Sequence, residues 1–209
     1  MYMPPHFAVS DRRTQLDFIR QTGWGYLTGI VRGEPFVTHL PFLLEGSDGN
    51  EKLVAHMARA NPHWESFAAG TPQLVVFPGP HAYVSPHWYQ SKKAVPTWNY
   101  AAAHVYGIPR IIDDPEQVIG AQKRLVDHYE SDFEQPWRME DVDADFIDGM
   151  LRAIVNFEIP VERIECKFKL SQNRPDADRE RVQAALGDSP NPGARAVAAL
   201  MAATDRADR

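Results

Sequence analysis

An arginine lies between a predicted strand and a predicted helix, where an anion could bind. The run 52–57 is typical of a strand, and Arg59 follows it closely. Asn61 suits the position just before a short helix, and Pro62 suits its first position. The free N–H groups at a helix start and a guanidinium fork both bind phosphate oxygens. The pattern predicts a phosphate-binding turn, and the alternative is an ordinary turn with a surface arginine.

An aromatic segment, 83–100, is the second candidate for chemistry. It contains two tryptophans, Trp88 and Trp98, three tyrosines and several polar side chains. Large rings with a polar tip form the walls of pockets for flat ligands, or the centre of a subunit interface. Because side chains alternate along a strand, Trp98 and its neighbours Thr97 and Asn99 point to opposite faces. Only part of this group can therefore meet a single ligand.

A polar turn in the segment 167–179 is the third candidate. Lys167 and Lys169 alternate with apolar residues, which predicts a strand, and Ser171 to Arg174 follow as a run of polar residues. Cations and neutral hydrogen-bonding groups together suit a ligand with many oxygens. The same residues also suit the beginning of a helix, so this segment leaves both interpretations open.

The eight histidines do not form a recognisable metal or catalytic motif. There is no HExxH, no Cys–His pair at zinc spacing and no GxSxG, so no metal site is expected and no catalytic residue is assigned. His39 and His56 fall on strands expected to be adjacent, where they could hydrogen-bond a polar ligand ring. The alternative is that both are ordinary strand residues. Cys166 has no base beside it in the sequence and is interpreted as structural.

The elements that must position these residues are mostly strands in the first half of the chain. Pro160 is expected to place its strand at a sheet edge or a bulge. Five or six antiparallel strands with peripheral helices predict an α+β fold built on a small closed or split barrel. The expected strands are 25–31, 36–44, 52–57, 73–77 (ended by Pro78–Gly79–Pro80), 95–112 (bent near Gly107), 155–161 and 167–170. The expected helices are 11–21 (capped by Ser10), 115–129, 146–154 and a C-terminal tail that begins at 175 and is interrupted at 187–193.

Composition narrows the class of protein. The chain has 209 residues and 22 Lys and Arg against 28 Asp and Glu, giving a net charge of −6. This charge opposes non-specific attraction to nucleic acid, so direct DNA binding is doubtful. No apolar run is long enough to cross a membrane, and the opening MYMPPHFAVSDRR has no signal-peptide pattern. With a single cysteine, Cys166, these features predict a cytoplasmic protein without membrane contact.

Six blocks together carry a family resemblance. They are MYMPPHF at the start, HLPFLL at 39–44, HMARANPHW at 56–64, YVSPHWY at 83–89, VPTWNY at 95–100 and KLSQNRPDADR at 169–179. In this order and spacing the chain resembles the FMN-binding negative transcriptional regulators, the PaiB family. The loop between Lys92 and Val95 is shorter here than the family pattern would suggest.

The resemblance implies an FMN-binding split β-barrel of the pyridoxamine-oxidase and flavin-reductase type, over residues 1–180, with a C-terminal helical appendage at 181–209. It also implies a homodimer with FMN at the subunit interface. FMN requires a cationic phosphate site, partners for the ribityl hydroxyls and an apolar slot for its ring. The residues expected to contact FMN are His39, His56, Met57, Ala58, Arg59, Asn61, Trp88, Lys92, Thr97, Trp98, Asn99, Lys169 and Gln172.

Three outputs are compatible with this resemblance. The first is a flavin-dependent oxidoreductase, although no residue identifies a substrate. The second is a regulator that uses FMN as a structural or sensing ligand, although no basic recognition helix is visible in the sequence. The third is a haem-binding or haem-handling protein, because a split barrel can also host haem and the chain has many histidines. FMN binding is the expectation common to the first two.

Overall fold

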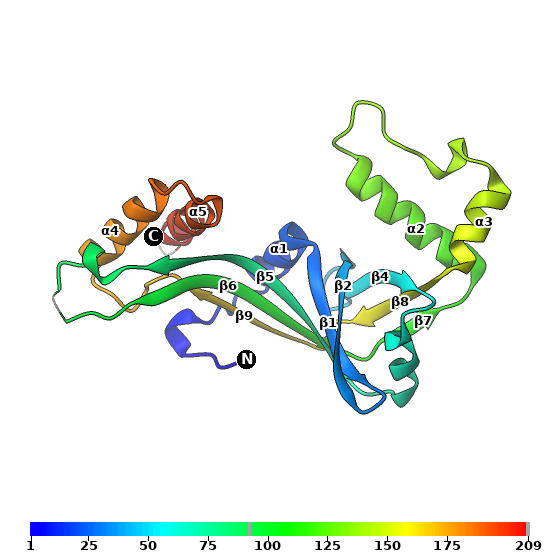
Figure 1. Ribbon diagram of the computed structural model, residues 1–209, viewed down its shortest axis with the longest axis horizontal. Coiled ribbons are helices and arrows are strands. Elements are labelled where there is room, and N and C mark those ends of the chain that lie inside the picture. The colour runs from blue at the N-terminus through cyan, green and yellow to red at the C-terminus, as the bar shows by residue number, and fades with distance from the viewer. Residues whose placement is uncertain (92, 208–209) are drawn as a thin grey trace. The chain divides into compact units, whose positions relative to one another are not determined.

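The computed structural model (Figure 1) describes residues 1–91 and 93–207, apart from the side chains of 205–207. Its strands are β1 (Trp24–Val31), β2 (Glu34–Pro41), β3 (Leu43–Glu45), β4 (Lys52–Ala58), β5 (Gln73–Val84), β6 (Thr97–Gly107), β7 (Arg110–Ile112), β8 (Ile154–Pro160) and β9 (Arg163–Lys169). Its α-helices are α1 (Arg12–Thr22), α2 (Pro115–Glu130), α3 (Ala144–Arg152), α4 (Asp176–Gly187) and α5 (Pro192–Ala207). Short 3-10 helices are η1 (Pro5–Phe7), η2 (Pro62–Ala69), η3 (Pro86–Trp88) and η4 (Met139–Asp141).

The strands form two sheets. Hydrogen bonding orders one sheet β2-β1-β5-β6-β9 and the other β3-β4-β8-β7. Within them, β1 pairs antiparallel with β2 and β5, and β8 pairs antiparallel with β4 and β7. This arrangement confirms the predicted α+β class. No helix in the described part of the chain is long and apolar enough to cross a membrane.

The chain divides into two compact units. The first unit comprises residues 1–18, 78–104 and 165–209, and the second comprises 19–77 and 105–164. Strands β5, β6 and β9 each contribute residues to both units. Residues 181–209 are part of the first unit, together with the aromatic segment 83–100.

The core of the second unit is aromatic and aliphatic. Phe157 on β8 is fully buried, and its ring centroid lies 5.1 Å from that of Phe67 on η2. Helix α2 brings Ala121 against buried Leu43 and Val54 of the neighbouring sheet, with Ile112 and Leu125 at the margin of this cluster. The apolar stripe of α2, predicted from its helical spacing, therefore faces the sheet that carries β4 and β8.

The core of the first unit includes both C-terminal helices. Figure 1 shows α4 and α5 side by side. Val182 and Leu186 on α4 and Val197 and Met201 on α5 are all buried. Burial of four such side chains removes enough apolar surface from water to hold the two helices in the unit.

Strand β5 corrects one prediction. Pro78–Gly79–Pro80 was expected to end the strand at Phe77, but β5 continues to Val84. Proline is compatible with extended backbone, so its ring does not by itself end a strand. Gly79 is required here because a Cβ atom would lie 2.7 Å from the Phe18 ring and 2.9 Å from the Ala101 carbonyl oxygen. The glycine thus marks a close approach and not a turn.

Pro160 was predicted to place its strand at a sheet edge or at a bulge, and the edge alternative is wrong. Strand β8 is central, because β4 pairs with it on one side and β7 on the other. Pro160 is the last residue of β8, opposite Lys52, and the pairing with β7 reaches only Glu158. A proline is tolerated there because its missing N–H faces no partner strand.

Other boundaries differ by small amounts. The expected strand 36–44 is divided into β2 and β3, and the expected strand 95–112 is divided into β6 and β7 just after Gly107. Helix α1 is capped by Asp11 and not by Ser10, because the Thr14 main-chain N–H donates to the Asp11 carboxylate at 2.8 Å. That bond and the one from the Thr14 hydroxyl lower the pKa of Asp11.

Candidate functional site

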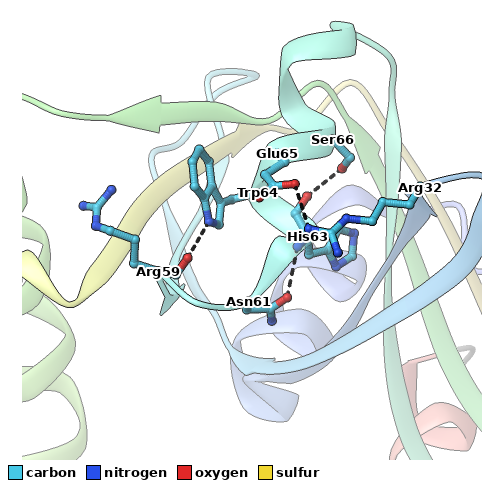
Figure 2. A network of polar contacts seen from close by, with 7 residues as sticks. All are labelled: Arg32, Arg59, Asn61, His63, Trp64, Glu65 and Ser66. Atoms are coloured by element: carbon cyan, nitrogen blue, oxygen red, sulfur yellow. Dashed lines mark hydrogen bonds and ion pairs between the residues drawn. The ribbon is translucent and has the colours of Figure 1, made fainter.

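The turn that was predicted to bind phosphate lies in the second unit, between β4 and η2 (Figure 2). Asn61 caps η2 as predicted, since its Oδ1 accepts a hydrogen bond from the His63 main-chain N–H at 3.0 Å. Pro62 is the first residue of η2, where its missing N–H costs nothing. The Trp64 indole N–H donates to the Arg59 carbonyl oxygen at 2.9 Å and closes the turn.

The Arg59 guanidinium is held by main-chain carbonyl groups. Its Nε donates to the Arg152 oxygen at 2.9 Å and its Nη2 to the Ile154 oxygen at 2.7 Å. These bonds join the turn to the connection between α3 and β8. A guanidinium has five N–H donors, so three remain for another acceptor. The side chain is exposed and fixed in orientation, which lowers the entropic cost of binding an anion.

A pocket of about 320 Å³ lies beside this turn. Arg59, Trp64 and Arg152 contribute to its wall, together with Asp113 and Asp148, so its charges are of both signs. Arg152 had no distinctive signal in the sequence, because it is a basic residue in the last turn of an ordinary amphipathic helix. The rest of the wall is mainly aliphatic, from Ile111, Ile112, Val118, Ile119, Leu151, Ile154 and Val155.

A network of polar side chains holds the start of η2 in place. His63 is fully buried, with its Nδ1 2.8 Å from the Thr38 hydroxyl and its Nε2 3.1 Å from Gln73 Oε1. The Asn61 amide donates to the same Thr38 hydroxyl at 3.1 Å. Burial lowers the pKa of His63. A Cβ atom on Gly29 would lie 2.7 Å from His63 Nε2, so only glycine leaves room for the imidazole.

His56 belongs to a second network, on β4. The Gln122 side-chain amide donates to His56 Nδ1 at 3.1 Å and to the Asn156 side-chain oxygen at 2.5 Å. His56 and Asn156 are cross-strand partners on β4 and β8, and burial lowers the pKa of His56. Sequence reasoning missed Gln122 and Asn156. A polar residue one helical turn from Val118, on the apolar stripe of α2, was the available signal for Gln122.

The remaining predicted residues of the second unit have separate environments. His39 is exposed on β2, with its ring centroid 4.7 Å from that of Tyr26. The strands that carry His39 and His56 belong to different sheets, so the expectation that they are adjacent strands is wrong. Met57 is buried in the core, and Ala58 is the exposed last residue of β4.

In the first unit, Lys169 joins two of the predicted residues. Its ammonium group donates to the Thr97 hydroxyl at 2.7 Å and to the Trp98 carbonyl oxygen at 2.5 Å. Partial burial lowers the pKa of Lys169, and the charges of Lys167 and Arg174 lower it further. Trp98 is 53% exposed, so aromatic surface is available to a ligand ring.

Asn99 and Gln172 have internal partners. Asn99 is fully buried and exchanges hydrogen bonds with the Ser171 hydroxyl, at 3.0 and 3.2 Å. The Gln172 side chain accepts from the Leu170 main-chain N–H at 2.7 Å and donates to the Phe168 carbonyl at 2.6 Å. Both side chains therefore stabilise the end of β9 and the turn after it.

Trp88 and Trp98 line the same pocket of the first unit, with Tyr83 and His81. Trp88 lies on η3, whose start is capped by the Ser85 hydroxyl, and it is half-buried. Lys92, also expected to contact FMN, lies outside the described residues. No group of His, Cys, Asp and Glu that could hold a metal ion occurs among the residues that the structure describes.

Comparison with known proteins identifies the family. Residues 1–163 match the family model described as "Putative FMN-binding domain". The chain is 35% identical over 201 residues to the protease synthase and sporulation protein PAI 2 of Bacillus subtilis, with 96% of each chain covered. This chain belongs to the PaiB family of FMN-binding proteins. The uncharacterized protein YKL070W of Saccharomyces cerevisiae is 36% identical over 153 residues, which cover 62% of this chain and 90% of the yeast protein.

Solved structures confirm the split-barrel flavoprotein fold of this PaiB-family chain. The flavocytochrome Anf3 of Azotobacter vinelandii aligns with a TM-score of 0.60 and 14% identity, over 86% of this chain and 78% of its own. The FAD and heme binding protein of Mycobacterium smegmatis aligns with a TM-score of 0.57 and 18% identity, over 85% and 79%. At such low identity the likeness concerns the fold alone, whereas the cofactor, FMN, follows from the family.

Proposed function

We propose that this PaiB-family protein binds FMN with the phosphate at the Arg59 turn. The observation that carries the proposal is the fixed guanidinium of Arg59, with three N–H donors remaining beside the capped start of η2. A preorganised guanidinium with unused donors is an arrangement that phosphate favours. The main-chain N–H groups of Arg59, Asn61 and His63 already have partners within the protein, so the guanidinium is the donor on which the proposal depends. Arg152, on the same pocket wall, adds a second cation.

The residues of the turn have distinct parts in this proposal. Arg59 would donate to phosphate oxygens, Asn61 would keep η2 in place through its cap, and His63 would hold Asn61 indirectly through Thr38. Bound FMN supplies hydride and single-electron transfer, which protein side chains do not provide. His56, Thr97, Trp98 and Lys169 remain predicted ligands, as do the other members of the predicted set.

We also propose that the protein is a homodimer. Trp24, Ile30 and Val37 on paired strands β1 and β2 are 48, 61 and 49% exposed. Alternation along the strands brings them to one face, which also contains Tyr26 and His39. An uncharged apolar sheet face of this kind suits burial against a second copy better than contact with water.

The biological function that we propose depends on the flavin and does not involve direct DNA recognition by this chain. Its net charge of −6 opposes the multiple phosphate contacts that tight DNA binding needs. Regulation of transcription would then pass through a partner protein. A cytoplasmic location suits the single unpaired cysteine, Cys166. The haem alternative is not favoured, because haem is named only for neighbours that share the fold at low identity.

A binding titration with two flavins tests the proposed phosphate site. Arg59→Ala should weaken FMN binding by about 1.5–3 kcal/mol, the range for a charged hydrogen bond. Riboflavin has the same ring and no phosphate, so its affinity should stay unchanged. Arg13→Ala is the matched control, since Arg13 is 90% exposed on α1. Equal FMN affinity for the folded Arg59→Ala variant and the wild type would refute the assignment.

A further inference from the structure

The pocket lined by Trp88 and Trp98 in the first unit has a second wall. The residues of that wall lie outside the six sequence blocks that carry the family resemblance. The pocket has a volume of about 460 Å³. One wall comes from β5, η3 and β6, through His81, Tyr83, Trp88 and Trp98. The other wall is the corner between α4 and α5, hereafter the C-terminal corner, contributed by Leu186, Ser189, Asn191, Gly193 and Ala194.

The aromatic wall is arranged to receive another ring. Trp98 has Tyr83 edge-on at 6.1 Å between ring centroids, with an interplanar angle of 77°. His81 lies 6.1 Å away on the same indole, tilted by 39°. Tyr83 and Trp98 remain 46% and 53% exposed, so aromatic surface is left uncovered. No Lys, Arg, Asp or Glu occurs among the described residues that line this pocket.

Hydrogen bonds and buried side chains hold the C-terminal corner in place. The Gly193 main-chain N–H donates to Asn191 Oδ1 at 2.8 Å, and Arg195 donates to the carbonyls of Ser189 and Pro190 at 2.8 and 2.9 Å. Leu186 and Ala194 anchor its two ends in the core. A Cβ atom on Gly193 would lie 3.4 Å from the His81 carbonyl oxygen, so the corner closely approaches β5.

A second contact fixes α4 to the aromatic segment. The Asp178 carboxylate on α4 is buried and accepts a hydrogen bond from the Gln90 main-chain N–H at 2.7 Å. Gln90 follows Trp88 by two residues. This hydrogen bond connects the helix pair to the segment that carries Trp88, within the first unit.

We propose that this pocket binds a planar, uncharged aromatic ring and that the C-terminal corner decides which rings enter. Electron-rich indole and phenol rings favour stacking or edge contacts with another ring, and the absence of charged lining residues disfavours ionic ligands. This deepens the proposed function, because the flavin ring is one source of such chemistry. A free planar substrate, such as a quinone, is the other source.

Two probes without phosphate separate these sources from each other and from the Arg59 site. Riboflavin presents the flavin ring, and menadione presents a two-ring quinone; binding is measured by equilibrium dialysis against the full chain. Trp98→Ala should raise the dissociation constant of the occupying probe about tenfold, the scale of one aromatic contact. Trp137→Ala is the control, since Trp137 is similarly exposed at 45% and lies in the second unit.

A second variant tests the C-terminal corner without altering the aromatic wall. Ser189 is half-buried, and Ser189→Leu places a larger side chain in the pocket. The variant loses the hydrogen bond from the Asn191 main-chain N–H to the Ser189 hydroxyl, at 3.2 Å, but keeps the bonds made by Gly193 and Arg195. Ser189→Leu should raise the dissociation constant of the same probe by a similar factor. If the variants weaken the binding of riboflavin alone, the pocket is assigned to the flavin ring. If they weaken the binding of menadione alone, it is assigned to another planar ligand.

The proposal is overturned if both folded variants bind both probes within twofold of the wild type. Thermal unfolding verifies that each variant is folded. Failure of the Arg59 phosphate assignment would be visible separately, as an FMN affinity insensitive to Arg59→Ala. Neither probe has a phosphate, so that failure would leave the test of the aromatic pocket intact.

Discussion

The hydroxyl of Thr38 lies 2.8 Å from Nδ1 of the fully buried imidazole of His63. On the other side of the ring, Gln73 Oε1 faces Nε2, while the Gln73 amide donates to the Ser66 hydroxyl at 2.7 Å. Gln73 Oε1 can only accept, so His63 Nε2 bears the proton. Burial lowers the pKa of His63 and so favours the neutral ring with this one proton. In the neutral ring Nδ1 accepts from the Thr38 hydroxyl, and Thr38 in turn accepts from Asn61. Each group in this network has a single consistent role, with a neutral imidazole at its centre.

Removal of the Thr38 hydroxyl should destabilise the protein. Thr38→Val leaves His63 Nδ1 without a donor and the Asn61 amide without its acceptor, so the free energy of unfolding should fall by about 1–3 kcal/mol. Urea denaturation followed by circular dichroism measures the change. Thr71→Val, at an exposed loop position, should change the stability by less than about 0.5 kcal/mol. Equal stabilities for both variants would show that the network contributes nothing.

Stability should fall as the pH decreases below about 6.5, the ordinary value for histidine. Burial lowers the folded-state pKa of His56 and of His63, so the unfolded chain binds these protons first. The unfolded state then gains stability, and each histidine can reduce the free energy of unfolding by up to about 1.4 kcal/mol per pH unit. Urea titrations of the wild type and of His63→Gln between pH 7.5 and 5 measure this slope. A wild-type slope no steeper than that of the variant would contradict the assignment to His63.

The thiol of Cys166 should be unreactive in the folded protein. Cys166 is fully buried on β9, and burial raises its pKa to about 12. Since the thiolate is the nucleophile, almost none is present at pH 8. Ellman's reagent should therefore release less than about a tenth of an equivalent within minutes from folded protein, and one equivalent after denaturation. Rapid reaction of the folded chain would place this cysteine in a more open environment.

A charge on the proposed dimer face should separate the subunits. Val37 is 49% exposed on β2, and Val37→Arg would place an unpaired cation within an apolar interface. An obligate dimer of this kind buries more than about 2,000 Å² in total. Light scattering at micromolar concentration with FMN present should give a dimer for the wild type and a monomer for the variant. The control, Glu116→Arg on an exposed site of α2, should remain dimeric.

Specific DNA binding should be absent from the isolated protein. Tight complexes require several Lys or Arg contacts with phosphates and are strongly weakened by salt. With a net charge of −6, the chain should give no mobility shift with its own upstream DNA at physiological salt. The flavin should instead respond to NADH or NADPH, followed by loss of its visible absorbance. A sequence-specific shift at physiological salt would make direct regulation the primary function.

Local patterns in the sequence were sufficient for much of the fold. The cap at Asn61 with Pro62 after it is present as predicted, because capping depends on residues a few positions apart. The same holds for the amphipathic stripe of α2, which packs against its sheet. Pro78–Gly79–Pro80 was interpreted wrongly as a strand end. Gly79 is needed there because Phe18 and Ala101, which are distant in the sequence, leave no room for a side chain.

The hydrogen-bond partners of the candidate site residues could not be predicted from local sequence patterns. Arg59 was predicted to bind phosphate oxygens, and nothing in the sequence indicated that two of its donors bond to carbonyls of the α3–β8 connection, 93 and 95 residues further along the chain. Asn99 was predicted to contact the ligand, and its amide is paired with Ser171 inside the first unit. Polar side chains accept any suitably placed partner, so their contacts depend on which segments meet.

The sequence by itself determined the family, the α+β class and the position of the capped turn, because these depend on residue types at short, fixed spacing. Only the tertiary structure decided which polar groups are used internally. It showed His63 enclosed by Thr38 and Gln73, and it brought the C-terminal corner beside Trp98. Those relationships arise from long-range packing of strands and helices, which the alternation of apolar residues permits but does not specify.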